Sequence, residues 1–191
     1  YKRQTPLMWG SGLRAPVGQS VHLAVMTALS LRLFGDPILK TPARPVEKFG
    51  DGLRSTAAEM LEIMDASGGV GLAANQVGLQ IRMFVYECNG MRGHLVNPVW
   101  HQVGTETQTG IEGCLSVPGV RGTITRAANV LATGSDVDGR PVAIAASGLL
   151  ARCIQHESDH LDGVMFMQRM EREEKNAAMA EIYASNWWKE K

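Results

Sequence analysis

The sequence carries no excess of either charge, since 19 lysines and arginines stand against 19 aspartates and glutamates in 191 residues. A chain with this balance lacks the basic surface that is typical of proteins binding nucleic acid or acidic membranes. It also lacks an apolar run of the roughly 20 residues that a membrane-spanning helix needs. The sequence therefore gives no signal for direct nucleic-acid binding, and we expect no membrane partner.

Cysteine is scarce as well. Cys88, Cys114 and Cys153 are odd in number and scattered along the chain. This usage fits a reducing compartment and leaves a thiol available for chemistry.

Acidic residues are missing from the start of the chain, where the first is Asp36 and where prolines and glycines are frequent. We expect residues 1–25 to be a leader or an added extension outside the fold, with Met26 as one option for the native start. Residues 26–191 are expected to form one domain with a substantial core. A targeting peptide is the less favoured interpretation, because no clear amphipathic helix accompanies the few basic residues.

What the sequence does contain is Cys-Ile-Gln-His-Glu-Ser-Asp-His-Leu at 153–161. His156 and His160 are four residues apart, so on a helix their imidazoles share one face, and Glu157 lies between them. The H-E-x-x-H spacing is typical of a metal site with a built-in general base. Two helical histidines cannot complete such a site, so a third ligand is required.

A helix is expected over Leu149–Leu161, which contains neither glycine nor proline and is followed by Asp162-Gly163. Glu157 falls beside the apolar stripe of this helix. Burial there would raise its pKa, which suits a group that transfers a proton near neutral pH. The simpler alternative is a surface helix with two solvated histidines and an unrelated glutamate.

Strand-like segments joined by Asn89-Gly90 and Asp138-Gly139 predict antiparallel hairpins. The expected strands are 81–88, 94–100, 129–133 and 141–145.

Two further helices are expected, one of about three turns from Leu53 to Ser67 and one over 171–188, where Trp187 and Trp188 would dock on the body of the protein. The elements together predict an α+β fold: mostly antiparallel sheets packed around a central metal-binding helix, with a C-terminal helix.

The stretch from Gly69 to Gly78 matches G-x-G-x-x-A, a loose form of the dinucleotide-binding fingerprint. That fingerprint follows a strand and opens a helix, whereas here the expected helix precedes and the expected strand follows. The small residues are better explained by a backbone that passes close to a core element or a ligand.

Cys114 is the best candidate for the third ligand, because it follows a glycine and precedes the Pro118-Gly119 turn, where a thiol could be presented at a strand edge. Cys88 lies inside an apolar segment, and Cys153 is one turn before His156. Both are expected to be buried thiols, with Cys153 lining the pocket wall.

Three segments in order along the chain resemble the three motifs of the peptide deformylases. They are Gly-Val-Gly-Leu-Ala-Ala-Asn-Gln at 69–76, Glu-Gly-Cys-Leu-Ser at 112–116 and Gln-His-Glu-Ser-Asp-His at 155–160. The resemblance implies hydrolytic removal of the formyl group from the N-terminal formyl-methionine of new polypeptides, with release of formate. It also implies one divalent metal ion per chain, bound by Cys114, His156 and His160 with water in the fourth position. Fe(II) is the metal expected in vivo, and zinc, nickel or cobalt could occupy the site.

A metal with three protein ligands lowers the pKa of bound water toward about 7. Glu157 would take the proton of this water and pass it to the leaving amine. The resemblance places the Gln76 side-chain amide and the Leu115 backbone N–H on the oxyanion. Glu112 and Arg126 are expected to pair and to brace the strand of Cys114.

The residues expected to contact the substrate are Val70, Gly71, Gly113, Leu149, Arg152, Cys153 and, farther out, Arg121. Val70 and Gly71 would bind the peptide backbone as if it added a strand. Leu149 and Cys153 would line the apolar slot for the methionine side chain. Arg152 would sit at the rim, with its stem packed and its charge in water.

The resemblance implies nascent formyl-methionyl polypeptides as partners and the bacterial cytoplasm as the location, an organelle being less favoured. The ribosome is a candidate partner through the last helix.

Two other functions remain open at this point. A zincin-type metallopeptidase shares H-E-x-x-H but usually takes a third histidine or glutamate as ligand, and no histidine follows His160. A non-catalytic relative that binds formylated peptides or metal would keep the same residues without turnover.

Overall fold

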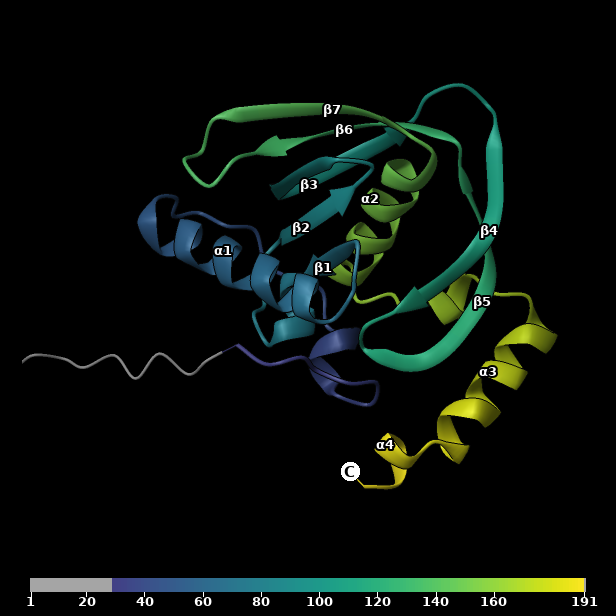
Figure 1. Cartoon of the computed structure of the whole chain (residues 1–191). Coiled ribbons are helices and arrows are strands. Elements are labelled where there is room, and N and C mark those ends of the chain that lie inside the picture. Colours follow the sequence, from purple (N-terminus) through teal and green to yellow (C-terminus); the bar gives the residue numbers. More distant parts are fainter. Residues whose placement is uncertain (1–28, 191) are drawn as a thin grey trace, which may run out of the picture.

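A five-stranded sheet lies at the centre of the molecule (Figure 1). The computed structural model describes residues 29–190; the proposed leader, with Met26, lies outside them. Across the sheet the strands are ordered β1 (Gly71–Ala73), β2 (Met83–Cys88), β3 (Met91–Gln102), β6 (Asn129–Ser135) and β7 (Pro141–Ser147). All four pairings are antiparallel, which confirms the predicted sheet type.

The two predicted hairpin turns are present. Asn89 and Gly90 both have positive φ, at 53° and 79°, which is the geometry that an Asn-Gly hairpin turn favours. β3 begins at Met91, directly after this turn, and is therefore longer than the predicted 94–100. Gly139, with φ at 83°, turns the chain between β6 and β7.

A second sheet consists of β4 (Thr107–Cys114) and β5 (Val117–Ala127). A strand was expected at Cys114, but without bounds, and β5 was not predicted. The two pair antiparallel and form a curved ribbon beside the larger sheet (Figure 1). Inward positions of β5 include Gly122 and Arg126 instead of apolar residues, so the alternation of a half-buried strand is hidden in the sequence.

Two helices cover the two faces of the large sheet. α1 (Asp51–Ala66) is longer than the three turns expected, because the helix already begins at Asp51. α2 (Gly148–Leu161) is the predicted metal-binding helix. Strand β2 alternates between them: Met83 and Val85 belong to the core under α1, and Phe84 and Tyr86 belong to the core under α2.

The C-terminal part is helical as predicted, but it is divided into η3 (Phe166–Arg169), α3 (Arg172–Ala184) and the short α4 (Asn186–Lys189). The indole N–H of Trp187 donates to the Pro118 carbonyl at 3.1 Å, and the Trp188 ring lies 5.8 Å from that of Phe34. Both tryptophans therefore dock on the body of the protein, as expected. Another short element, η1 (Pro37–Lys40), follows the Gly35-Asp36 turn. No described helix has the length and apolar character of a membrane span.

Candidate metal centre and active site

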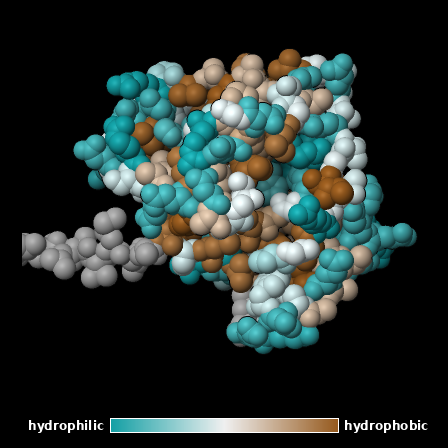
Figure 2. Space-filling view, viewed as in Figure 1, coloured by the Kyte–Doolittle hydropathy of each residue, from teal (hydrophilic) through white to brown (hydrophobic). Residues whose placement is uncertain are grey.

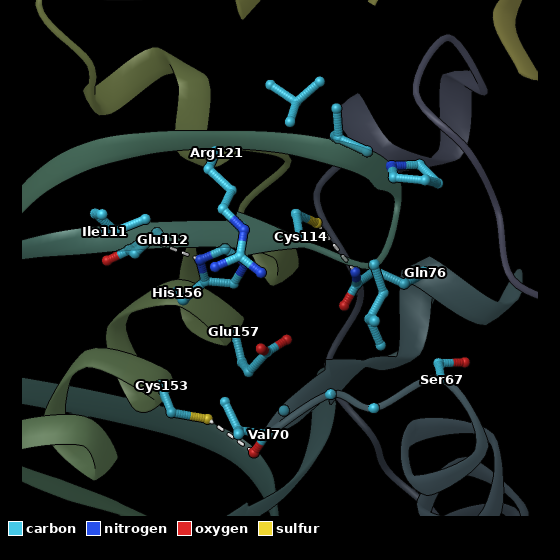
Figure 3. Close-up of a pocket in the computed structure, with 18 of the residues that line it drawn as sticks. Ser67, Val70, Gln76, Ile111, Glu112, Cys114, Arg121, Cys153, His156 and Glu157 are labelled. Atoms are coloured by element: carbon cyan, nitrogen blue, oxygen red, sulfur yellow. Dashed lines mark hydrogen bonds and ion pairs between the residues drawn. The ribbon is translucent and has the colours of Figure 1, made fainter. Parts of the chain in front are cut away.

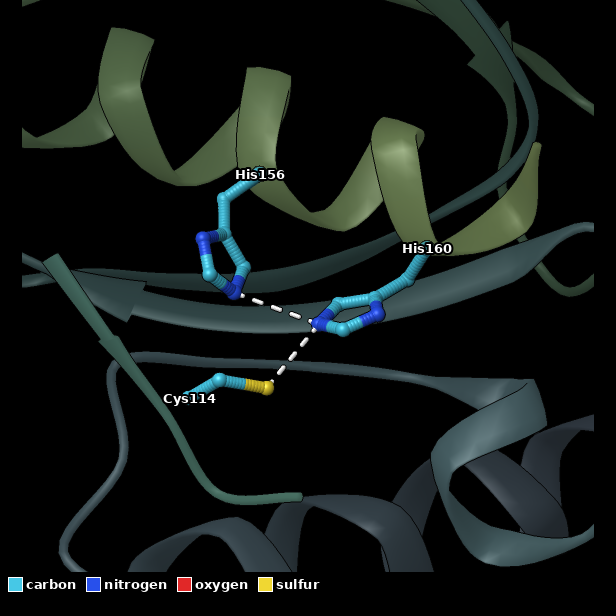
Figure 4. Close-up of side chains that lie close together, drawn as sticks. All are labelled: Cys114, His156 and His160. Carbon is cyan, nitrogen blue, oxygen red and sulfur yellow. Dashed lines mark hydrogen bonds between the residues drawn. The ribbon is translucent and has the colours of Figure 1, made fainter. Parts of the chain in front are cut away.

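Helix α2 presents the two histidines of the H-E-x-x-H motif toward the β4–β5 ribbon (Figure 4). The helix ends at Leu161, and Gly163 (φ 75°) carries the chain away in a left-handed turn. A side chain at 163 would be strained in this conformation, and its Cβ would lie only 2.7 Å from the Lys40 carbonyl oxygen. The stop predicted at Asp162-Gly163 is thus confirmed.

Cys114 lies at the end of β4, where it meets the two histidines. Its Sγ is 3.2 Å from the Nε2 atom of His160, and that atom is 3.2 Å from the Nε2 atom of His156 (Figure 4). One donor atom from each of the three residues lies within 4.8 Å of the others. The fold thus brings the Cys114 thiol next to two imidazoles that follow it by more than forty positions in the sequence (156 − 114 = 42).

The two imidazoles have opposite electrostatic environments. Burial, together with the neighbouring His156, lowers the pKa of His160 well below its usual value, so His160 is neutral. Burial alone would also lower the pKa of His156, but hydrogen bonds with Cys114 and Glu112 raise it well above the usual range. A divalent cation among these donors would displace the protons of the thiol and of the His156 Nε2 atom, because ligation requires the deprotonated forms.

Glu112 orients the ring of His156. Its Oε2 atom accepts a hydrogen bond from the His156 Nδ1 atom at 2.9 Å, and Arg126 donates to both carboxylate oxygens at 2.9 and 3.0 Å. Burial would raise the pKa of Glu112, yet hydrogen bonds from His156 and Arg126 outweigh it and hold the pKa well below the usual value. The predicted Glu112–Arg126 pair is therefore present, and it has an additional partner in a candidate ligand.

Glu157 is the one acid of α2 that faces the interior without a strong partner. It is 4% exposed, and its Oε2 atom is buried without a hydrogen-bond partner. Burial raises the pKa of this carboxyl to about 7, as the sequence predicted in direction. The side chain projects into the cavity between Val70 and Gln76 (Figure 3).

Gln76 lies across the cavity from Glu157, on η2 (Ala74–Val77). Its Oε1 atom accepts from the Ala73 N–H at 2.8 Å. Its amide nitrogen lies 3.4 Å from the Cys114 sulfur and donates to the Ser116 hydroxyl at 3.1 Å. The amide N–H groups are thereby held beside the cluster of candidate ligands, next to Leu115, which also lines the cavity.

A cavity of about 600 Å³ opens at this cluster. It lies between β1 and the β4–β5 ribbon, and in the space-filling view the surface is hollowed beside the ribbon (Figure 2). All residues expected to contact a substrate line it: Val70, Gly71, Gly113, Arg121, Leu149, Arg152 and Cys153. The Arg121 side chain extends from β5 toward the cavity and passes in front of His156 in the view of Figure 3.

Arg152 departs from the expectation. Its side chain is 10% exposed, and its guanidinium donates to Glu112 at 2.8 Å and to the Ile124 carbonyl at 3.0 Å. The expectation of a charge held in water at the rim is therefore wrong. The physical reason is that the ribbon supplies acceptors for the buried guanidinium, and a paired charge can be buried.

Gly71 allows the backbone of β1 to pass directly beneath α2. A Cβ atom at this position would lie 2.6 Å from the Cys153 sulfur and 2.9 Å from the Glu157 Cδ atom. The small residues of the 69–78 segment thus allow the backbone to pass close to α2. They do not form a dinucleotide site, because that fingerprint follows a strand and opens a helix. Here the three-residue strand β1 lies within the segment and only the short η2 turn follows it.

Replacing Gly71 with alanine is expected to destabilise the fold by about 1–3 kcal/mol, the usual cost of overpacking, and to displace the Glu157 carboxylate. Urea unfolding measures the first effect. Gly52→Ala is the matched control, since nothing lies within 4 Å of a Cβ there and alanine favours the helix. Equal stability of Gly71→Ala and wild type would contradict the close approach.

Comparison with known proteins decides the family. The family model for polypeptide deformylase matches residues 28–176. The chain is 52% identical over 167 residues to peptide deformylase 1 of Corynebacterium efficiens, covering 85% of this chain and 99% of that protein. The chain belongs to the polypeptide deformylase family. It is thus an enzyme that removes formyl groups from nascent peptides, and the family to which it belongs is metal-dependent.

Solved deformylase structures share the fold. That of Synechococcus elongatus, in complex with actinonin, superposes with a TM-score of 0.76 at 40% identity and covers 80% of this chain and 86% of that one. That of Thermus thermophilus gives 0.75 at 40% identity, over 81% and 92%. The predicted α+β class and the predicted family are confirmed.

The sequence of this deformylase did not indicate the contact between Glu112 and His156 or the burial of Arg152. One pattern could have indicated the burial of Arg152. It is four residues before His156, so the two side chains are neighbours on the helix face that carries the expected metal ligands. Asp159, which binds Arg126 at 2.5 Å and Arg169 at 2.7 Å, was also missed.

Proposed function

We propose that this deformylase hydrolyses N-formyl-methionyl peptides with Glu157 as the group that transfers the proton and with Cys114, His156 and His160 as the metal ligands. The observation that carries the proposal is the position of Glu157. A buried carboxylate with an unpaired oxygen borders both the substrate cavity and the one Cys/His cluster found among the described residues.

The donor set fits a divalent transition metal. A thiolate and two imidazoles suit zinc, iron, nickel and cobalt, and the thiolate favours softer, redox-active ions. We infer Fe(II) in vivo, with zinc, nickel or cobalt as substitutes, at one ion per chain. Once bound, such an ion supplies a Lewis acid that polarises the formyl carbonyl and lowers the pKa of water.

Glu157 then acts as general base and acid. Its raised pKa of about 7 lets it accept a proton from water and return it to the leaving amine near neutral pH, because a catalytic group works best when its pKa is close to the working pH. Its unpaired oxygen supports this role, since it is not committed to another hydrogen bond in the protein.

Gln76 and the Leu115 backbone N–H are proposed to stabilise the oxyanion. The contacts of Gln76 with Ala73 and Ser116 hold its amide in place before substrate arrives, and such preorganised donors stabilise developing charge.

Replacing Gln76 with leucine should therefore lower kcat for formate release by about 10²–10³-fold while the bound metal is retained. Gln102→Leu, at an exposed position of β3, is the control. A rate within twofold of wild type would remove Gln76 from the proposed mechanism.

The peptide is proposed to bind along the open edge of β1. The Val70 carbonyl accepts from the Glu87 N–H at 2.9 Å, so it faces β2. In an antiparallel pair, the backbone groups of successive residues point alternately toward the partner strand and away from it. The N–H and C=O of Gly71 therefore face the edge of β1 that has no neighbouring strand, where a peptide could add as a strand. Gly113, on β4, lines the same cavity and is proposed to contact the peptide from there.

The methionine side chain is proposed to enter the cavity past Leu149 and Cys153. Leu149 is 41% exposed at the mouth, and Cys153 is buried deeper on the same helix. Arg121, exposed on β5, is proposed to contact the peptide farther from its N-terminus. The aliphatic part of the Arg152 side chain would form part of the cavity wall.

We further propose that residues 26–191 form one catalytic domain that acts on nascent chains in the bacterial cytoplasm. Contact with the ribosome through α3 and α4 is a hypothesis that co-sedimentation with purified ribosomes can test.

The decisive assay measures formate released anaerobically by Fe(II)-loaded protein from a formyl-Met peptide, next to cleavage of an internal peptide bond in a blocked peptide. Rapid formate release without internal cleavage supports the proposal. Internal cleavage would favour the metallopeptidase alternative, and binding without formate release would favour a non-catalytic relative.

A further inference from the structure

Arg152 is a buried charge to which the proposed mechanism gives no chemical step. It lies on α2 one turn before His156, and its guanidinium reaches three acceptors on the β4–β5 ribbon. It donates to a Glu112 oxygen at 2.8 Å, to the Ile124 carbonyl at 3.0 Å and to the Gln108 carbonyl at 3.2 Å. One side chain thus connects the helix with both strands of the ribbon.

The acceptor that matters is the Glu112 carboxylate, because each of its oxygens has two donors. Oε1 accepts from the Arg126 Nε atom and the Arg152 Nη1 atom. Oε2 accepts from the Arg126 Nη2 atom and from the Nδ1 atom of His156. With Arg152 occupying Oε1, the second oxygen stays turned toward the imidazole.

This arrangement determines which nitrogen of His156 is free. An Nδ1–H that donates to a fixed carboxylate leaves Nε2 as the lone-pair atom, and such partners of a ligating histidine typically contribute 10–100-fold to metal affinity. The Nε2 atom is the one that faces His160. Arg152 therefore acts on a candidate ligand through an intermediate carboxylate.

The ribbon is shaped to admit this guanidinium. A Cβ atom at Gly110 would lie 3.1 Å from the Arg152 Nη2 atom and 3.5 Å from its Cζ atom. A larger residue at 110 would push the guanidinium away from Glu112. A lysine at 152 would keep the charge, but its single ammonium has no planar fork to match acceptors on two strands and a carboxylate at once.

We propose that Arg152 is a positioning residue that holds Glu112 in the orientation that fixes the His156 tautomer and keeps Nε2 directed at the metal. The inference rests on the proposed metal ligands.

The test compares zinc-loaded wild type, Arg152→Met and Arg152→Lys as full-length chains. Two readouts do not depend on turnover: the rate of zinc transfer to a chromogenic chelator, and the NMR signal of the His156 Nδ1–H proton. We expect Arg152→Met to lose zinc about tenfold faster than wild type. This is the low end of the 10–100-fold effect typical of residues that hydrogen-bond to a metal ligand. We also expect its Nδ1–H signal to shift or broaden. Arg152→Lys should lie between the two. For the Fe(II) form, kcat should fall more than KM rises.

Two comparisons separate this role from a merely structural one. In a Glu112→Gln background the effect of Arg152→Met on zinc transfer should disappear, because the intermediate is gone. Arg169→Met is the control, because it removes another guanidinium that binds a carboxylate of α2, that of Asp159. The Arg169 side chain is 50% exposed, and exposed ion pairs contribute little. The rate of zinc transfer should therefore stay within about twofold of wild type.

Folded Arg152→Met with a wild-type zinc rate and Nδ1–H signal would overturn the inference, as would an equal effect in the Glu112→Gln background. If Arg152→Met does not fold, Arg152→Lys decides by the same two measurements. Wild type that retains no zinc, or that releases no formate with Fe(II), would instead overturn the proposed function.

Discussion

Glu157→Gln is expected to keep the metal and to release formate about 10²–10⁴-fold more slowly than wild type, the range that a positioned proton-transfer group contributes. Glutamine has nearly the same shape but cannot take a proton from water. Because Glu157 lines the cavity beside the ligand cluster without being part of it, the substitution should leave metal content unchanged. Single-turnover formate release and metal analysis of the same sample measure both effects.

The stability of the metal-free variant provides a second check. Burial raises the pKa of Glu157 from 4.5 to about 7, so the folded state favours the protonated carboxyl. Ionisation of Glu157 therefore destabilises the folded state as pH rises above 4.5. Glutamine resembles the protonated form. Thermal unfolding near pH 8 should therefore show Glu157→Gln at least as stable as wild type.

Glu62→Gln, at an exposed position of α1, is the control for the Glu157 experiment and should behave as wild type. Fast turnover by Glu157→Gln would show that another group transfers the proton.

Cys114→Ala should abolish metal retention and formate release together. The thiolate is one of only three donors in the cluster, and the two imidazoles that remain on α2 cannot enclose an ion. The loss of affinity should exceed the 10–100-fold that is typical for partners outside the ligand set. Metal content after gel filtration, measured by mass spectrometry, reports the effect directly.

Cys88→Ala is the matched control for the cysteine experiment. Cys88 is 1% exposed, and its thiol donates a hydrogen bond to the Val70 carbonyl at 3.5 Å, away from the proposed ligands. It should keep its metal. Full metal content in Cys114→Ala would exclude the sulfur from the coordination sphere and reopen the metallopeptidase alternative.

The elements predicted correctly are those whose pattern is local. The i, i+4 histidines, the uninterrupted apolar face and the following glycine determine α2 within a dozen residues. The Asn89-Gly90 turn likewise specifies the β2–β3 hairpin. The glycine before Cys114 and the Pro118-Gly119 turn after it indicated which of three thiols would join the histidines, and the family resemblance implied the same residue.

The elements that were missed depend on distant partners. Strand β5 buries Gly122 under the Met170 side chain and Arg126 between two acids, so neither position carries the apolar residue that marks a strand. The burial of Arg152 requires a carboxylate and two carbonyls from the ribbon. No window of the sequence around Arg152 contains those acceptors, so propensity alone predicts a solvated charge.

The separation of the proposed metal ligands along the chain has a consequence for biosynthesis. The sulfur of Cys114 leaves the ribosome first, and both imidazoles follow more than forty residues later, with α2. A chain that lacks α2 therefore contains only one of the three donors of the proposed cluster and cannot form the site. An enzyme of this family, which removes formyl groups from other growing polypeptides, could therefore bind a metal at the proposed site only after α2 has been synthesised.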